Sequence, residues 1–215
     1  MIIRYLGHAA FLIIAPNGTR IITDPYNAEK CGDSFRFEKI VESADIVTIS
    51  HEHNDHNFDR LSGDPVYIRG GGNKEVKGIK ITGIDVFHDD QQGRQRGPNT
   101  IFNLDVEGLN IVHLGDLGHI LTTEDVKRIG PVDILLIPVG GYFTIGPKVA
   151  QDVIDALKPR IVIPMHYQNE KCTFPIAPVD DFIKDKDFQR FPGEIEITKD
   201  RLPRTTTIYV LPPTK

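Results

Sequence analysis

Cysteine is scarce in this sequence, whose 215 residues include only Cys31 and Cys172. Two cysteines in a chain of this length do not suggest a disulfide framework, so we expect reduced thiols and a cytoplasmic protein. Long hydrophobic runs are also lacking, since none approaches the ~20 apolar residues that a membrane-spanning helix needs. Arg4, Gly7 and His8 interrupt the apolar N-terminal residues, which argues against a signal peptide.

An excess of positive charge is missing as well. The formal net charge is −5 at pH 7, whereas proteins that bind the phosphate backbone usually carry a basic stripe, so a nucleic-acid partner is not expected. With 40% hydrophobic residues, the chain can bury a full core, and the absence of repeats or long linkers predicts one domain over residues 1–215. Gly70-Gly71-Gly72 lacks the Gly-Lys-Ser/Thr ending of a phosphate loop and is interpreted as a turn.

Histidine, by contrast, is concentrated in one segment. Residues 51–56 read His-Glu-His-Asn-Asp-His and follow the apolar run Asp45–Ile49, which predicts a short buried strand. Because side chains on a strand repeat every two residues, His51 and His53 point to the same side and can bind one metal ion. A polar surface loop that happens to be rich in histidine is the alternative, but this spacing favours a metal site.

The same segment offers a second pair of donors. Asn54 is predicted to cap a short helix over residues 55–61, which would turn Asp55 and His56 toward a second ion position. The N-terminus of a helix also favours the Asp55 carboxylate and the neutral form of His56, which is the form that binds metal.

Three further potential ligands follow predicted strands. His88 follows residues 84–87, Asp116 follows 109–114 and His166 follows 160–165. A set of nitrogen and oxygen donors suits two borderline or hard divalent ions, with zinc first and iron or manganese next. No cysteine belongs to the set, which argues against copper(I) and iron–sulfur clusters.

The remaining pattern of apolar runs and turn signals predicts many strands and a few helices. The predicted strands cover residues 1–6, 9–14, 20–23, 45–49, 66–68, 79–87, 100–106, 109–114, 133–138, 160–165, 194–198 and 206–211. The predicted helices cover residues 37–44, 122–128, 147–157 and 182–188. Thr122 and Asp125 favour a capping box, and Pro147 favours a helix start. Strands in runs followed by helices are typical of two packed sheets with helices outside, although periodicity alone leaves several arrangements open.

These motifs resemble the metallo-β-lactamase superfamily, whose ligand series is His-x-His-x-Asp-His, a strand-end histidine, Gly-Asp and a final strand-end histidine. More narrowly, five segments resemble the small hydrolases grouped with ascorbate-6-phosphate lactonase, namely residues 6–11, 23–25, 113–119, 138–141 and 163–167. The similarity extends over about residues 1–170. It implies an α/β fold, the four-layer αββα sandwich.

The resemblance also implies how the donors divide between two ions. One ion would be held by His51, His53 and His88, the other by Asp55, His56 and His166, and Asp116 would bridge both. Two divalent ions roughly 3.5–4 Å apart can share a water and lower its pKa from near 15.7 toward about 7. The resulting hydroxide would attack a carbonyl carbon or phosphorus, while the ions stabilise the oxyanion. Asp55 is predicted to orient the hydroxide and to accept its proton.

Three more polar residues fall near the predicted ligands. Asp24, in Thr23-Asp24-Pro25, matches a superfamily position that usually hydrogen-bonds behind the metal ligands, with a simple Asp-Pro turn as the alternative. His8 and His113 are predicted to lie inside strands. At both positions, the pattern favours a hydrogen-bonded core histidine at least as much as a role in the site. Neither residue therefore belongs to the predicted ligand set.

Five residues are candidates for substrate contact. His119 and Tyr142 follow predicted strands and could reach the substrate or protonate a leaving group. Gln91, Arg94 and Arg96 belong to the polar loop after the strand-end histidine at position 88. A solvated loop is the alternative, but arginine matches the geometry of phosphate and carboxylate, which predicts an anion-binding role.

Together these observations predict a metal-dependent hydrolase with two divalent ions and a small, anionic substrate. The narrower resemblance suggests a phosphorylated lactone, and a phosphodiester or nucleic-acid strand is the alternative because one pair of ions serves both reactions. A flavodiiron-type redox protein is disfavoured because His53 stands where that class has glutamate. A non-catalytic metal-binding module is disfavoured because every ligand position is filled. Whether the chain forms a homo-oligomer is left open.

Overall fold

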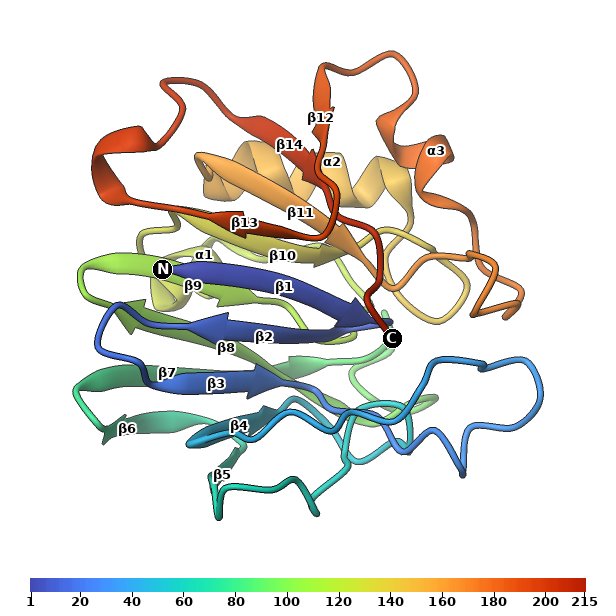
Figure 1. The fold of residues 1–215 in the computed structure, drawn as a ribbon. Helices are drawn as coiled ribbons and strands as arrows, with labels where there is room; N and C mark the ends of the chain where they lie inside the picture. Colours follow the sequence, from blue (N-terminus) through green and yellow to red (C-terminus); the bar gives the residue numbers. More distant parts are fainter.

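Two mixed β-sheets packed face to face form the centre of the computed structural model, which describes residues 1–215 (Figure 1). The strands are β1 (Ile2–Gly7), β2 (Ala10–Ile14), β3 (Arg20–Thr23), β4 (Ile46–Ile49), β5 (Val66–Arg69), β6 (Gly72–Val76), β7 (Ile79–Phe87), β8 (Pro98–Val106), β9 (Leu109–His113), β10 (Ile134–Pro138), β11 (Ile161–Met165), β12 (Phe188–Arg190), β13 (Glu194–Glu196) and β14 (Thr207–Val210). The helices are α1 (Thr123–Ile129), α2 (Pro147–Leu157) and α3 (Val179–Ile183), with one 3₁₀ turn at Lys199–Arg201.

Strand order explains how the chain forms both sheets. One sheet has six strands in the order β13-β1-β2-β3-β4-β5, and the other has eight in the order β12-β14-β11-β10-β9-β8-β7-β6. Strands β1 to β3 and β6 to β9 pair antiparallel through short connections. Strands β9, β10 and β11 pair parallel, and the required crossovers contain α1 and α2. Strand β13 is an edge strand of the six-stranded sheet, and β14 lies between β12 and β11 in the eight-stranded sheet.

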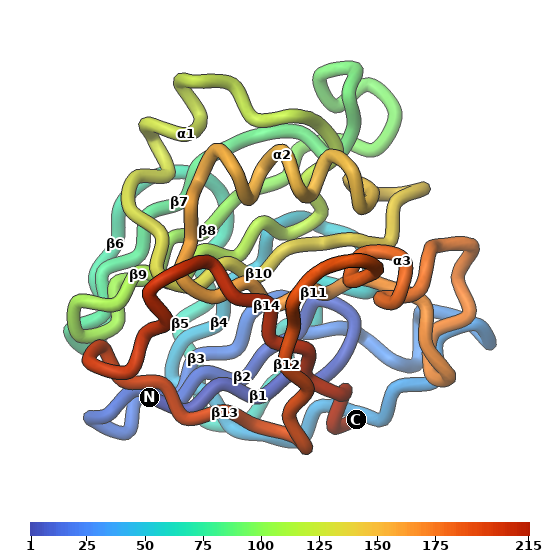
Figure 2. Tube along the Cα trace, turned by 90° about the horizontal axis from the view of Figure 1, so that it is seen from above, coloured from blue at the N-terminus to red at the C-terminus, as the bar shows by residue number.

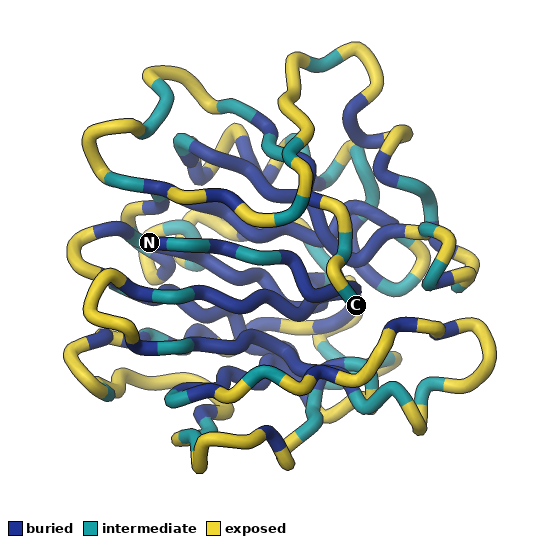
Figure 3. Tube along the Cα trace, in the orientation of Figure 1, coloured by how far each residue is buried: buried dark blue, intermediate teal, exposed yellow.

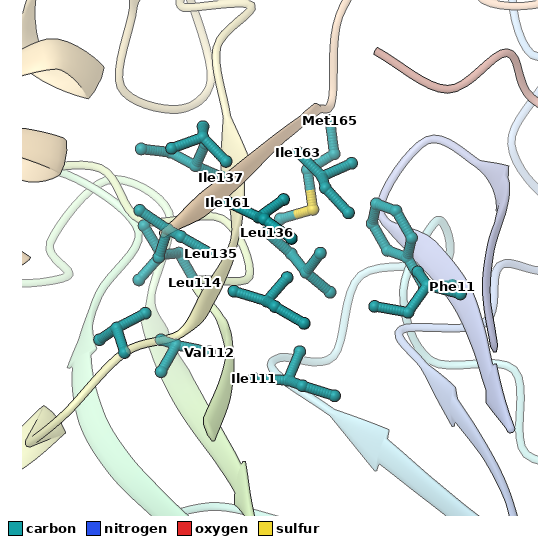
Figure 4. Packing of buried hydrophobic residues seen from close by; sticks show 14 of the residues in the cluster. Phe11, Ile111, Val112, Leu114, Leu135, Leu136, Ile137, Ile161, Ile163 and Met165 are labelled. Atoms are coloured by element: carbon teal, nitrogen blue, oxygen red, sulfur yellow. The ribbon is translucent and has the colours of Figure 1, made fainter. Parts of the chain in front are cut away.

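Apolar side chains cover both faces of the six-stranded sheet. Along β2, Phe11 belongs to the core that both sheets share, whereas Leu12 belongs to a second cluster on the opposite face. Figure 4 shows Phe11 across from Leu136 and Ile163 of the eight-stranded sheet. The shared core contains 49 buried residues, and burying one such side chain contributes roughly 1.5–3 kcal/mol. Figure 3 shows the result, with buried strands in the middle and exposed chain at the loops.

The outer layers differ between the two sides of the sandwich (Figure 2). On the eight-stranded sheet, α1 packs against β7, and α2 buries Ala150, Val153 and Ile154 in the shared core. On the six-stranded sheet, irregular chain replaces helices, and the second cluster is closed by residues such as Phe35 and Phe37. The predicted α/β class with two packed sheets is confirmed. None of the three helices is long and apolar enough to cross a membrane.

Several local predictions are confirmed at the level of single residues. α2 covers the predicted span Pro147–Leu157, with proline in its first turn. α1 begins after Thr122, whose side chain accepts the Asp125 backbone N–H, while the Asp125 carboxylate accepts the Thr122 backbone N–H. This reciprocal capping box is the one that the sequence predicts.

The predicted helix over residues 37–44 is wrong. That segment contains no regular secondary structure. Phe35 and Phe37 are buried while Arg36 and Glu38 are exposed, which is the two-residue period of extended chain. The carbonyl of Glu38 accepts the hydroxyl hydrogen of Tyr26, at 2.9 Å. Covering the outer face of the sheet therefore outweighs the helical tendency of this segment.

The predicted helix over residues 55–61 is also wrong. Residues 54–56 form a turn, closed by the His56 N–H on the His53 carbonyl, and no helix follows. The backbone N–H of Phe58 donates instead to the carbonyl of Pro25, and the carbonyl of Asn54 accepts from Asn27. Bonds to the segment after β3 therefore replace the helical bonds, and no helix terminus lies behind Asp55.

Two differences concern the sheet edges and the C-terminal part. The predicted helix over 182–188 lies earlier, at Val179–Ile183, and ends where Lys184 turns extended and Asp185 takes a φ of 61°. Residues 188–190 form the edge strand β12 instead. Strand β6 was not predicted, because its Asn-Lys-Glu centre is exposed and carries no apolar pattern.

Candidate metal centre

The C-terminal ends of six strands lie at one edge of the sandwich (Figure 1). A polar residue follows each of these strands. The residues are His8 after β1, Asp24 after β3, His51 after β4, His88 after β7, Asp116 after β9 and His166 after β11. All six are buried, although polar side chains of these types are seldom fully buried without partners. The apolar strands therefore carry a polar cluster at this edge.

The first group of donors contains His51, His53 and His88, whose nearest ligand atoms all lie within 4.8 Å of one another. His51 and His53 belong to one turn after β4, and His88 follows the last residue of β7. The structure thus brings together the three histidines that the resemblance assigns to one ion. His53 is exposed while the other two are buried, so this group opens toward solvent.

The second group contains His8, Asp55, His56 and His166, again within 4.8 Å. Asp55, His56 and His166 form the predicted second set. His8 was excluded from that prediction as a residue inside a strand, and this placement is wrong. His8 lies in the turn between β1 and β2 and points its Nε2 at Asp55 Oδ2, at 3.1 Å.

Asp116 lies between the two groups. Its Oδ2 is 3.2 Å from His88 Nε2 in the first group and 3.3 Å from His166 Nε2 in the second. Its Oδ1 is 3.4 Å from His56 Nε2. The Asn99 side chain fixes the loop by accepting the Asp116 N–H, at 3.0 Å. One buried carboxylate therefore faces donors of both groups.

Asp24 orients one histidine of each group from behind. Its carboxylate accepts the His56 Nδ1–H at 2.9 Å and the Ser50 hydroxyl hydrogen at 2.5 Å. Because Ser50 has given its hydrogen to Asp24, its oxygen accepts from His51 Nδ1, at 2.9 Å. Both histidines are consequently held through Nδ1 and direct Nε2 toward the centre. The geometry agrees with the supporting role proposed for Asp24.

The electrostatics of the centre favour a bound cation. Burial lowers the pKa of His51 to about 3, so the ring is neutral and able to bind metal. Although burial opposes it, the neighbouring histidines keep the pKa of Asp116 well below its usual range. Burial would also lower the pKa of His56, but Asp116 and Asp55 raise it well above its usual value. The carboxylates thus attract positive charge to this point.

Unpartnered buried atoms provide the direct test of whether metal fits. Three such atoms face the centre without a hydrogen-bond partner, namely His51 Nε2, His56 Nε2 and Asp116 Oδ1, and Nδ1 of His8, His88 and His166 is unpartnered as well. More than about 90% of buried polar groups in proteins have a partner, so a cluster of exceptions requires an explanation. A divalent ion would supply the missing partner to the three atoms that face the centre, and nitrogen and oxygen donors suit zinc, manganese or iron.

The loop of residues 89–97 is held by one carboxylate. Asp89 accepts the backbone N–H groups of Gln91, Gly93, Gln95 and Arg96, each at 2.8–2.9 Å. Burial alone would raise the pKa of Asp89, but these four bonds lower it to about 2. The backbone of the loop is therefore held around the Asp89 carboxylate.

Of the three loop residues predicted to bind an anion, Arg96 borders a pocket. A pocket of about 430 Å³ beside the first donor group is lined by His51, His53, Arg69 and Arg96 among others. Gln91 and Arg94 are exposed and do not line it. Sequence reasoning missed Arg69, the last residue of β5, although its position at a strand end on this edge is a usable signal.

The two arginines differ in their partners. Arg69 pairs with Glu52, with Nε 3.0 Å from Oε1. Arg96 forms no ion pair, and its guanidinium donates to the Tyr142 carbonyl at 3.1 Å and to the Gln95 side chain at 3.4 Å. Glu52 and Asp85 also line the pocket, but neither forms an ion pair with Arg96. Of the two arginines of the pocket, Arg96 is the one without a carboxylate partner.

The two predicted proton donors are held differently. His119 uses both ring nitrogens on backbone groups, accepting from Phe87 N–H at 3.2 Å and donating to the Ile120 carbonyl at 2.9 Å. Tyr142 has a φ of 62°, its side chain is 67% exposed and its hydroxyl forms no hydrogen bond. Tyr142 is therefore free to contact a substrate, whereas His119 would first have to break backbone bonds.

His113 has the structural role that the sequence left open. Its Nε2–H donates to the Ala9 carbonyl at 2.8 Å, and its Nδ1 accepts the Gly115 N–H at 3.1 Å. With both nitrogens bonded to backbone, His113 ties the turn before β2 to the loop that carries Asp116.

Comparison with known proteins shows the family to which the chain belongs. Residues 2–166 match the family described as the beta-lactamase superfamily domain, which places the chain in the metallo-β-lactamase superfamily. A solved structure from Thermotoga maritima, described as a candidate Zn-dependent hydrolase of that superfamily, is 36% identical and has a TM-score of 0.80, covering 98% of this chain and 99% of that one.

Two relatives place the chain in a narrower family within this superfamily. A UPF0173 metal-dependent hydrolase from Thermococcus onnurineus is 31% identical over 77% of this chain and 84% of its own, and one from Pelotomaculum thermopropionicum is 30% identical over 84% and 88%. The chain belongs to the UPF0173 metal-dependent hydrolase family. At this level the predicted metal-dependent hydrolase is confirmed, while the likeness to the ascorbate-6-phosphate lactonase group stays a prediction.

Proposed function

We propose that the protein is a hydrolase with two divalent metal ions that acts on a small, anionic substrate. The observation that carries the proposal is the arrangement of two donor groups that share one carboxylate. Each group supplies at least three nitrogen or oxygen donors within 4.8 Å, and Asp116 faces both. Zinc is the first candidate for the ions, with manganese or iron as alternatives.

The bound ions, Asp55 and Tyr142 are proposed to have separate roles in hydrolysis. When bound, two divalent ions would supply Lewis acidity that makes water more acidic and stabilises negative charge developing on the substrate. Asp55 is the carboxylate of the centre that reaches solvent, with a side chain 22% exposed against 3% for Asp116. Asp55 is therefore proposed to orient the attacking water and to accept its proton. Tyr142 is proposed to contact the substrate or protonate its leaving group.

The neighbouring pocket supports the class of substrate. Its volume of about 430 Å³ lies within the roughly 300–1,000 Å³ of small-molecule sites. Arg96, which lacks a carboxylate partner, would bind a phosphate or carboxylate group separate from the bond that is cleaved. A phosphorylated lactone meets this description, and so does a small phosphodiester. A screen of the metal-loaded protein against lactones, thioesters and phosphodiesters would decide between them.

Metal content tests the proposed centre directly. We expect elemental analysis of protein prepared without chelator to find close to two ions per chain, because the two donor groups are complete. Removing the ions with a chelator should abolish hydrolysis, and adding zinc or manganese should restore it. A protein that never holds more than one ion after reconstitution would contradict the centre with two ions.

The anion-binding role is tested by comparing two arginines of the same loop. Arg96→Ala should raise KM for an anionic substrate by about tenfold and leave kcat nearly unchanged, since it removes binding common to the ground and transition states. Arg94→Ala is the matched control and should have little effect, because Arg94 is exposed and lies outside the pocket. The double variant should behave like Arg96→Ala alone.

A neutral lactone or ester completes this test. Arg96 also donates to the Tyr142 carbonyl, so its removal could disturb the loop rather than anion binding. If Arg96→Ala impairs neutral and charged substrates equally, Arg96 only shapes the loop, and the anion-binding role would have to be abandoned.

A further inference from the structure

His8 occupies a backbone position that the fold maintains against its ordinary preference. Its φ is 56°, which is uncommon for a residue other than glycine, and the pairing of β1 with β2 shifts register between Tyr5 and Gly7 just before it. The His8 carbonyl accepts two hydrogen bonds at 2.8 Å, one from the Tyr5 hydroxyl and one from the His166 N–H at the end of β11. Both sheets therefore fix this turn.

The His8 side chain is fully buried beside the second donor group. Its ring lies 4.1 Å from the ring of His166, 5.2 Å from that of Phe35 and 5.9 Å from that of Phe174, measured between centroids. These contacts fix the plane of the ring. They leave Nε2 facing the carboxylate of Asp55.

His8 supplies the one hydrogen bond of the Asp55 carboxylate. This bond joins His8 Nε2 to Asp55 Oδ2, at 3.1 Å. His56 Nε2 lies farther from Asp55 Oδ2, at 3.8 Å, which is too long for a hydrogen bond. No helix N-terminus lies behind Asp55, because residues 54–56 form only a turn.

We propose that His8 is a positioning residue for the second metal ion. Because a carboxylate can only accept, His8 Nε2 carries the hydrogen and donates it to Asp55 Oδ2, which leaves the other oxygen of Asp55 available to the ion. The hydrogen bond from His8 thus stabilises the Asp55 carboxylate, a role that the sequence assigned to the N-terminus of a helix. This inference rests on the proposed function, since it presupposes a second ion.

Two substitutions separate the hydrogen bond from the packing. His8→Phe keeps an aromatic ring among Phe35, Phe174 and His166 but removes the donor, whereas His8→Gln keeps an N–H donor and removes the ring. The readout is metal affinity, measured by titrating metal-free protein with zinc in competition with a chromogenic chelator. We expect His8→Phe to lower the affinity for the second ion by about 10-fold to 100-fold and to leave the affinity for the first ion unchanged.

His8→Gln should retain the affinity for the second ion to within about threefold of the unmodified protein. Tyr5→Phe serves as the control for the turn, since it removes one bond to the His8 carbonyl and leaves the side chain intact. It should bind both ions normally.

The outcomes are distinguishable from one another. If the unmodified protein never binds two ions, the proposed function fails. If it binds two and His8→Phe binds both equally well, the positioning role is overturned while the proposed function stands. If His8→Gln loses the second ion and His8→Phe retains it, packing of the ring is what matters, which also overturns the inference.

Discussion

Asp116→Asn should lower kcat/KM for hydrolysis by at least ~10²-fold, which corresponds to about 2.7 kcal/mol of transition-state stabilisation. The substitution keeps the shape of the side chain but removes the negative charge that faces both donor groups. Its oxygens lie 3.2–3.4 Å from nitrogens of His88, His166 and His56, so an amide would weaken the binding of both ions. Steady-state kinetics with metal-loaded protein measure the effect.

The fold should survive this substitution, because apolar packing builds the strands that carry the centre. Far-UV circular dichroism should therefore stay native while activity falls. Asp152→Asn on the exposed face of α2 is a matched control and should change neither quantity. Near-normal turnover of Asp116→Asn would show that this carboxylate does not bridge the ions.

Strand-end residues account for what the sequence could predict of the site. A short apolar run marks a buried strand, and the first polar residue after it falls at the strand's C-terminal end, as His88 and His166 do. Once several such ends lie on one edge, their side chains must meet. The two groups of donors and the position of Asp116 between them follow from this pattern together with the family resemblance.

His8 shows why one donor was missed. The sequence was interpreted as placing His8 inside a strand, yet the pairing shifts register between Tyr5 and Gly7, and the chain turns at residue 8 with a φ of 56°. A shift of one residue reverses the direction of a side chain, and nothing in the local pattern of apolar residues reports it. The bond from His166 N–H to the His8 carbonyl is a contact between the two sheets, which local sequence does not encode.

The two wrongly predicted helices were also overruled by contacts between segments distant in sequence. Residues 37–44 and 55–61 contain apolar residues at spacings compatible with a helix, but each segment lies against the six-stranded sheet or the loop after β3. Bonds such as Phe58 N–H to the Pro25 carbonyl satisfy their backbone groups without a helix. Arg69 was missed because the pocket that it lines with Arg96 forms between loops distant in sequence.

Gly118→Ala should disrupt the centre through backbone contact alone. A methyl group at this position would overlap the carbonyl carbon and oxygen of His88 and the nitrogen of Asp89. Backbone atoms cannot rotate away as a side chain can, so the loop that carries Asp116 and the loop that begins at His88 must separate. The Gly118 N–H bond to the Phe87 carbonyl, at 3.1 Å, would also be strained.

The expected result is a fall in kcat/KM of roughly 10²-fold, since a displacement of about 1 Å can cost that much in a positioned site. The free energy of unfolding should also fall, by roughly 1–3 kcal/mol, as for other overpacked positions. Gly193→Ala is the matched control, because a methyl group there would meet nothing within 4 Å, and its effect on stability should stay within about 0.5 kcal/mol. Urea unfolding and kinetics measure both quantities. If Gly118→Ala were as active and stable as Gly193→Ala, the close contact between the two loops would not be what sets the distance from His88 to Asp116.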